Sequence, residues 1–276
     1  MRRRWVMVLG GAAALAVVVG VVAFATGAFD SDEEPEERLT RSAPGETAAE
    51  PAGVEFCAGV TQLDAALTQV PEDPAEFGAF VAERITPTVA AIRAALPRSE
   101  TAPDAEAVLT AVEQAAATGD GAAFDTPAFA AAQARYYRYV ADACDYPLVE
   151  AIATDHAFAG IPTRAKAGPT VVTLTNDSEG GEFHEIALVK LVPEATLPLD
   201  EFVVLPPEEA EALIDPATFG LGAYAAPGET GGAIVELSAG RWVYACFVPT
   251  GTTDPAAEGT GPPHAANGMY GEVTVS

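Results

Sequence analysis

The sequence is poor in the residues that bind metals or act as nucleophiles, and poor in positive charge. Its 276 residues include only three cysteines, three histidines and three methionines. Lysine and arginine number 14 against 40 aspartates and glutamates, which gives a formal net charge of −26. A surface of that charge repels polyanions, which argues against nucleic acid as a partner.

Several motifs of enzyme chemistry are also missing. The chain has no H-E-x-x-H zinc motif, no G-x-S-x-G nucleophile motif and no phosphate-binding glycine loop. Its serines, aspartates and glutamates form no recognisable catalytic triad or carboxylate pair. We therefore expect a protein that binds or carries something and is not an enzyme.

The first 53 residues lack the pattern of a folded domain. Within residues 1–29, basic residues precede Trp5–Phe29, an uncharged run long enough to cross a bilayer. With acidic residues following it, this run predicts a single-pass cell-membrane anchor and an extracytoplasmic chain. A cleaved signal peptide, and hence secretion, is the alternative. Residues 30–53, acidic and rich in proline and alanine, are expected to be a disordered linker.

Residues 54–145 show the apolar spacing of a small bundle of four helices. The predicted helices cover residues 54–69, 74–96, 103–118 and 127–144. Thr86-Pro87 should kink or split the second of them. In an up-down-up-down bundle, Cys57 and Cys144 lie at the same end, so we predict a disulfide between them. An extracytoplasmic location permits that bond.

In residues 146–276, apolar and polar residues alternate and turn signals separate the segments, which predicts a β-sandwich. Together with the helices, this predicts an α+β multidomain protein. The expected strands are Ile152–Phe158, Thr170–Asn176, Phe183–Val192, Ala233–Leu237, Arg241–Val248 and Tyr270–Val275. A short helix is expected within Pro206–Leu213.

The alternation of side chains along the predicted strands directs His184 and Cys246 toward the core. His184 shares a face with Ile186 and Leu188, while the acidic Glu185 belongs to the opposite, outer face. Cys246 likewise falls on the apolar face of its strand. A lone core histidine is more often hydrogen-bonded than metal-bound, and a lone buried cysteine is usually a small hydrophobe.

Further along the chain, His264 and Met269 complete a possible metal site. Two histidines, one cysteine and a weak axial methionine are the ligands of a blue-copper site. The remaining histidine, His156, is expected to be structural or exposed. Since this region holds one cysteine and the chain has no His-x-His pair, binuclear copper centres and multicopper oxidase clusters are excluded.

The residues around these positions resemble the cupredoxin (plastocyanin/azurin-like) family. The resemblance rests on His184 in EFHEIAL, Cys246 in YACF, and His264 and Met269 in PPHAANGM. It implies a Greek-key sandwich, copper as the cofactor, and these four residues as its ligands. The phrases AFAGIP, AGPTVVTLTND and FHEIALVKL are also similar to secreted actinobacterial proteins that join a small helical domain to a cupredoxin-like domain.

One feature departs from the small electron carriers of this family. They have only a few residues between the cysteine and the following histidine, whereas 17 separate Cys246 from His264. We therefore keep two hypotheses. The first is an extracytoplasmic mononuclear copper protein for single-electron transfer or copper handling, with a redox protein as a possible partner. The alternative is a metal-free cupredoxin-like structural or interaction module of the cell surface.

Overall fold

A computed structural model describes most of the chain beyond the N-terminal region. The described residues are 52–71, 73–97, 101–119, 122–124, 126–254 and 257–276. The predicted membrane anchor and nearly all of the predicted linker lie outside them. Within these ranges, no helix combines the length and apolar character needed to span a bilayer.

The helices of the first part follow the predicted pattern closely. They are α2 (Val54–Leu67), α3 (Pro74–Phe80), the π-helical η2 (Val81–Ile85), α4 (Thr86–Ala95), α5 (Ala102–Thr118), the short η3 (Ala122–Phe124) and α6 (Pro127–Cys144).

The predicted break at Thr86-Pro87 is present as a π-helical turn. Pro87 has no N–H to donate, so a regular helix cannot continue through it. The chain adapts at the preceding residue, where the Thr86 N–H bonds to the carbonyl of Val81, five residues back. The expected long second helix is therefore three consecutive segments.

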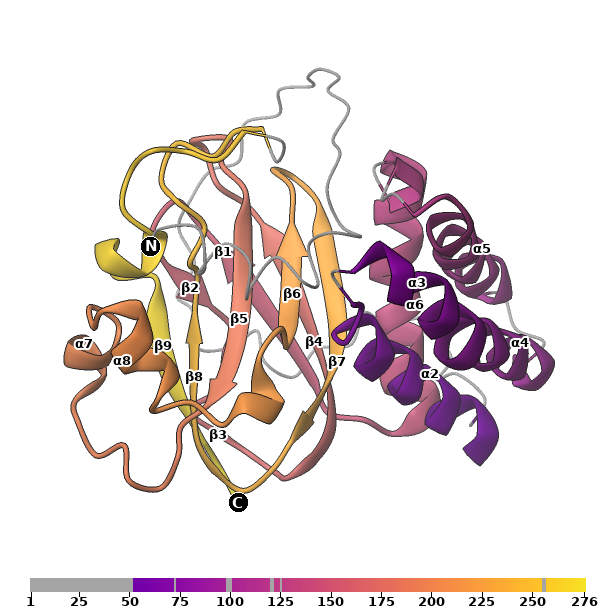
Figure 1. Ribbon diagram of the computed structural model, residues 1–276, viewed down its shortest axis with the longest axis horizontal. Helices are drawn as coiled ribbons and strands as arrows, with labels where there is room; N and C mark the ends of the chain where they lie inside the picture. The colour runs from indigo at the N-terminus through magenta and orange to yellow at the C-terminus, as the bar shows by residue number, and fades with distance from the viewer. Residues whose placement is uncertain (1–51, 72, 98–100, 120–121, 125, 255–256) are drawn as a thin grey trace, which may run out of the picture.

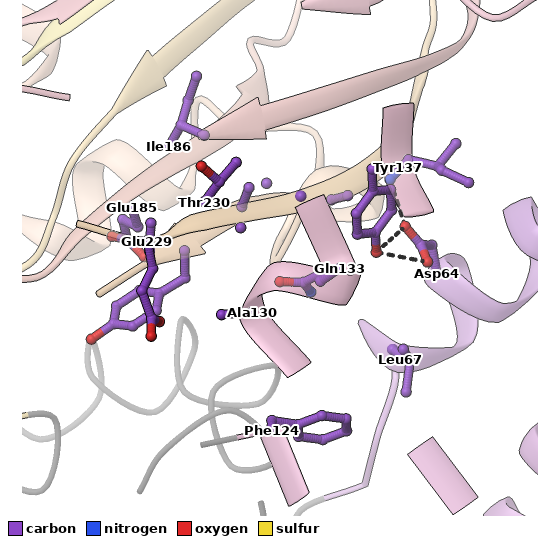
Figure 2. Close-up of a pocket in the computed structure, with 18 of the residues that line it drawn as sticks. Asp64, Leu67, Phe124, Ala130, Gln133, Tyr137, Glu185, Ile186, Glu229 and Thr230 are labelled. Atoms are coloured by element: carbon purple, nitrogen blue, oxygen red, sulfur yellow. Dashed lines mark hydrogen bonds between the residues drawn. The ribbon is translucent and has the colours of Figure 1, made fainter. Parts of the chain in front are cut away.

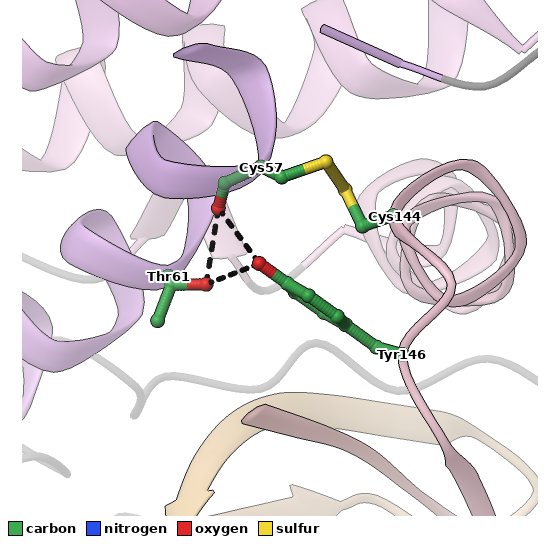
Figure 3. Close-up of a disulfide and its surroundings, with 4 residues drawn as sticks. All are labelled: Cys57, Thr61, Cys144 and Tyr146. Atoms are coloured by element: carbon green, nitrogen blue, oxygen red, sulfur yellow. Dashed lines mark hydrogen bonds between the residues drawn. A yellow bond between two sulfur atoms is a disulfide. The ribbon is translucent and has the colours of Figure 1, made fainter. Parts of the chain in front are cut away.

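The predicted disulfide between Cys57 and Cys144 is confirmed, with a Cα–Cα distance of 5.6 Å. It joins the first turn of α2 to the last residue of α6 (Figure 3). The Tyr146 and Thr61 hydroxyls both donate to the Cys57 carbonyl oxygen, at 3.3 and 3.0 Å. The bond therefore lies where the helices end and the strands begin.

Among the described residues, nine strands follow the helices of the first part. They are β1 (Leu148–Ala153), β2 (Phe158–Ala159), β3 (Arg164–Ala165), β4 (Gly168–Asn176), β5 (His184–Lys190), β6 (Gly222–Ala225), β7 (Thr230–Leu237), β8 (Gly240–Ala245) and β9 (Tyr270–Val275). Between β5 and β6 lie the short helices α7 (Leu199–Phe202), α8 (Pro207–Glu211) and η4 (Pro216–Thr218), and η5 (His264–Asn267) precedes β9.

The strands form two mixed sheets that pack face to face (Figure 1). One sheet has the order β2-β1-β4-β7 and the other the order β3-β9-β8-β5-β6. The pairs β1–β4 and β3–β9 are parallel, and the remaining neighbours are antiparallel. Strands β4 and β5 belong to different sheets although they follow one another in sequence, and so do β6 and β7. An apolar core that includes Trp242 and Leu174 fills the space between the sheets.

The helical part packs against the outer face of the first sheet, beside β4 and β7 (Figure 1). Val171 of β4 and Ile234 of β7 belong to the same apolar core as the helices. The buried Asp64 of α2 accepts hydrogen bonds from the Ile234 N–H at 2.5 Å and from the Tyr137 hydroxyl. Since β7 is the edge strand of its sheet, this carboxylate satisfies a backbone donor that no further strand could reach.

Two predictions about strands were wrong. The expected strand Ile152–Phe158 is interrupted, because β1 ends at Ala153 and a turn separates it from β2. The acidic Glu185 does lie on the face opposite His184, but it is only partly exposed, and its carboxylate accepts the Phe247 N–H. The two-residue β3 and the four-residue β6 were not predicted at all.

Candidate metal centre

His184, Cys246 and His264 converge in the interior of the sandwich. One potential ligand atom from each residue lies within 4.8 Å of the others. The Cys246 Sγ is 3.7 Å from the His184 Nδ1 and 3.3 Å from the His264 Nδ1. All three side chains are 0% exposed. The sequence prediction that these residues come together is correct.

Three different elements bring these side chains together. His184 is the first residue of β5, Cys246 directly follows β8, and His264 begins η5. Strands β5 and β8 are antiparallel neighbours, with Ala187 opposite Ala245. Sheet pairing therefore places His184 and Cys246 near the same end of the sandwich, and only His264 depends on the long loop.

Backbone hydrogen bonds at its base close the long loop between Cys246 and His264. The Thr250 N–H bonds to the Pro262 carbonyl at 2.9 Å. Nearer the site, the His264 N–H bonds to Val248 at 3.0 Å and the Ala265 N–H bonds to Cys246 at 2.8 Å. These hydrogen bonds hold the two ends of the loop together, so the extra residues do not separate Cys246 from His264.

Glu182 fixes the orientation of His264. Its Oε2 lies 2.9 Å from the His264 Nε2 and also accepts the Gly251 N–H at 2.7 Å. Burial raises the pKa of Glu182, but the Gly251 N–H and His264 outweigh it, so the net pKa lies below its usual range. The ionised carboxylate favours a proton on Nε2, which leaves the Nδ1 lone pair directed at Cys246.

His184 is held in the neutral form. Burial, aided by the proximity of His264, lowers the pKa of His184 to about 4. Its Nε2 is buried and has no hydrogen-bond partner among the described residues. A neutral imidazole is the form that binds a metal ion, so no proton need be displaced from this residue at neutral pH.

Cys246 is a free, fully buried thiol. Burial raises the pKa of Cys246, with a further contribution from the nearby Glu185 carboxylate. Its sulfur accepts the Glu185 N–H at 3.4 Å. A thiol of this kind stays protonated unless a positive charge replaces the proton, which a metal ion provides.

Met269 lies in the same apolar core as Cys246 and is 0% exposed. Its carbonyl oxygen accepts the Cys246 N–H at 3.0 Å, and its own N–H bonds to the His264 carbonyl at 3.2 Å. The backbone thus ties Met269 to both of these residues, and the role of its side chain as an axial ligand stays a prediction.

The donor set fits a copper ion. It offers two imidazole nitrogens and one thiolate sulfur, a combination that suits copper, in an apolar and water-excluded setting. Ile186 and Leu188 are buried beside these donors in the same core, as the strand phase predicted. Because the donor atoms are already close together and buried, the protein around a bound ion would need little rearrangement when the charge of the ion changes.

The third histidine lies just outside this group. His156 is exposed, in the turn between β1 and β2, and its ring centre is 5.7 Å from that of His264. The expectation that it is structural or exposed is therefore met.

Sequence reasoning missed Glu182 and Asn176 beside the site, and it placed Glu185 in solvent. Glu182 and Glu185 flank the His184 segment, and Asn176 supports it by donating to the carbonyl oxygens of Glu182 and Ala225 at 2.9 and 3.0 Å.

Comparison with known proteins gave structural neighbours only. No family model matches the chain, and no curated protein matches it. Auracyanin B is similar at 23% identity, over 47% of this chain and 88% of that one, with a TM-score of 0.28. Rusticyanin from Thiobacillus ferrooxidans is similar at 21% identity, over 47% of this chain and 77% of its own, with a TM-score of 0.28.

A third neighbour is auracyanin A, a "blue" copper protein from Chloroflexus aurantiacus. It is similar at 19% identity, over 47% of this chain and 99% of that one, with a TM-score of 0.27. At TM-scores this low, we take the fold and the site from the topology and contacts above. The chain combines a helical part with a β-sandwich that contains a buried His-Cys-His cluster.

Proposed function

We propose that this protein binds one copper ion through His184, Cys246 and His264 and carries single electrons. The observation that supports it most is the approach of three donor atoms to within 4.8 Å of one another, on side chains that are all 0% exposed. Bound there, copper supplies a one-electron Cu(II)/Cu(I) couple, and Met269 is the candidate axial ligand that tunes its potential.

The chain's own residues hold the donors in fixed positions. Glu182 orients the His264 ring, and the Glu185 N–H donates to the Cys246 sulfur. Hydrogen bonds of this kind to ligand residues set both the orientation and the basicity of the ligand atoms. The surrounding core excludes water, so the donors need not reorganise when an electron arrives or leaves.

Burial of the donors favours electron transfer over catalysis. The side chains of His184, Cys246 and His264 are all 0% exposed, so a substrate molecule has no direct path to the metal. An electron, unlike a substrate, can pass through the packed protein. We therefore propose that the protein exchanges electrons with a redox protein partner and does not transform a substrate itself.

We also propose that the helices and the sandwich lie outside the cytoplasm. The disulfide between Cys57 and Cys144 supports this location, because such bonds persist in oxidising compartments. Residues 1–29 would then attach the protein to the cell membrane, or direct its secretion if they are removed.

Copper titration with calorimetry, followed by voltammetry of the loaded protein, tests this function. We expect one copper ion per chain and a reversible one-electron wave. Tight binding without a reversible wave would point to copper handling instead. Absence of binding would favour the alternative hypothesis of a metal-free structural or interaction module.

A further inference from the structure

A cavity of about 310 Å³ lies between the helical part and the sandwich (Figure 2). One wall comes from helices α2, α5 and α6, and the other from strands β5, β6 and β7. Sites for small molecules have volumes of roughly 300–1,000 Å³, so this cavity suits a compact ligand.

The helical wall is mainly apolar but includes Asp64 and Gln133, and the wall formed by the strands carries two further carboxyl groups. Aliphatic and aromatic side chains line the helical side, namely Leu63, Leu67, Val108, Val112, Phe124 and Phe129. Glu185 and Glu229 line the strand side, near Thr230 (Figure 2). Tyr224, which is the register partner of Glu185 across β5 and β6, contributes an aromatic ring to the same side.

The side chains of the cavity that ionise near neutral pH are all carboxyl groups, and burial raises the pKa of Asp64 and of Glu185 to about 7. Three carboxylates line the cavity, and none of its lining residues is a lysine, an arginine or a histidine. Asp64 is fully engaged, because its oxygens accept hydrogen bonds from Tyr137 and Ile234. Glu185 is different: its Oε1 accepts the Phe247 N–H at 3.0 Å, and its Oε2 has no hydrogen bond within the described part of the chain.

We propose that this cavity binds a small organic cation, an amine with an apolar body. The ammonium group pairs with the Glu185 carboxylate beside Glu229 and Tyr224, where a carboxylate and an aromatic ring both attract it. The apolar body lies against Leu67 and Phe124. The net charge of −26 raises the local concentration of such cations near the protein. This proposal does not depend on copper binding.

Calorimetric titration of the copper-free full chain tests the proposal with two matched probes. The probes are 2-phenylethylammonium and 2-phenylethanol, which share one apolar body and differ in charge. We expect the ammonium to bind at least about tenfold more tightly, as a hydrogen bond to a charged group implies. Glu185→Gln keeps an acceptor for Phe247 but loses the charge, and should remove most of that preference.

A pair of variants on α6 tests whether the probe occupies this cavity. Ala130 lines the cavity, whereas Ala128 is exposed and does not. Ala130→Phe should fill the space and reduce ammonium binding at least about tenfold, because it removes the volume that the body occupies. Ala128→Phe should leave binding unchanged.

Three results would overturn the proposal. They are equal affinity for the two probes, no binding of the ammonium at millimolar concentration, and unchanged binding in folded Ala130→Phe. If Ala130→Phe does not fold, Glu185→Gln decides the matter, and undiminished preference for the ammonium in that variant overturns the proposal.

Discussion

Glu182 and His264 are 82 residues apart in the chain, and their side chains meet at 2.9 Å between Oε2 and Nε2. The same carboxylate oxygen accepts the N–H of Gly251, in the long loop that separates Cys246 from His264. The long loop between Cys246 and His264, which small carriers lack, thus supplies a hydrogen bond from Gly251 that holds Glu182 in place. Glu182 in turn orients His264, so the long loop helps to stabilise the site.

Replacing Glu182 with glutamine should weaken copper binding. The variant loses the negative charge that fixes the proton on Nε2 of His264, so the Nδ1 lone pair is no longer reliably directed at Cys246. Partners of this kind typically contribute about 10–100-fold to metal affinity, and we expect a loss of that size. Competition with a copper chelator of known affinity measures it.

Glu179→Gln is the matched control, because Glu179 is exposed on the same segment. It removes an identical charge without touching the site and should leave the affinity within about twofold of the wild type. Equal losses in the two variants would show that Glu182 acts only through general charge.

Asn176→Ala should destabilise the sandwich. The Asn176 side chain is 1% exposed and donates to the carbonyl oxygens of Glu182 and Ala225. Its removal leaves two acceptors without their donor, at a cost of about 2–4 kcal/mol in the free energy of unfolding. Urea denaturation checks this, with Asn267→Ala as a control that loses one exposed hydrogen bond to Thr250 and should change stability by less than about 1 kcal/mol.

Gly232→Ala should weaken the packing of α6 against β7. A Cβ at this position would lie 2.4 Å from the Tyr137 ring, so the helix must move or the ring must rotate. We expect a loss of about 1–3 kcal/mol in the free energy of unfolding.

Gly78→Ala is the same substitution at another glycine, and we expect it to stabilise the fold. A Cβ at Gly78, within α3, meets no atom within 4 Å. This substitution should raise stability by up to about 1 kcal/mol through helix propensity. If both variants were equally destabilised, close approach of Tyr137 could not be the reason.

The buried Asp64 should make stability depend on pH. Burial raises the pKa of Asp64 to about 7 from its ordinary value of 3.8, although the Ile234 N–H and Tyr137 hydroxyl oppose the shift. Between these values the folded state binds more protons than the unfolded state, so the free energy of unfolding falls as pH rises from about 4 to about 7. The contribution is on the order of 2–4 kcal/mol.

Asp64→Asn keeps a side chain that can bond to Ile234 and Tyr137 but cannot ionise. Its free energy of unfolding should therefore decline less between pH 4 and 7 than that of the wild type, in denaturation curves at several pH values. Identical slopes for the two proteins would contradict a raised pKa at Asp64.

The part of the fold that depends on local pattern was predictable from sequence. Helical periodicity located α2, α5 and α6, and the scarcity of cysteine, histidine and methionine identified the cluster. Alternation also gave the phase of His184 and Cys246 correctly. These features follow from side chains a few residues apart, whose spacing reflects the element that contains them.

The features that failed depend on contacts between distant segments. Glu185 is acidic, so alternation placed it in solvent, whereas in the fold it lines the cavity between helices and strands and accepts the Phe247 N–H. Strand β6, with the sequence Gly222–Ala225, is too short for a periodic signal. The closure of the loop before His264 uses backbone groups, which leave no trace in residue type.

The visible absorption spectrum of the copper-loaded protein tests the central claim most directly. If copper binds to the Cys246 sulfur between His184 and His264, Cu(II) should give an intense thiolate-to-copper band. Cys246→Ser should abolish that band while the Cys57–Cys144 disulfide stays intact. A colourless wild-type protein, or the same band in Cys246→Ser, would contradict the claim.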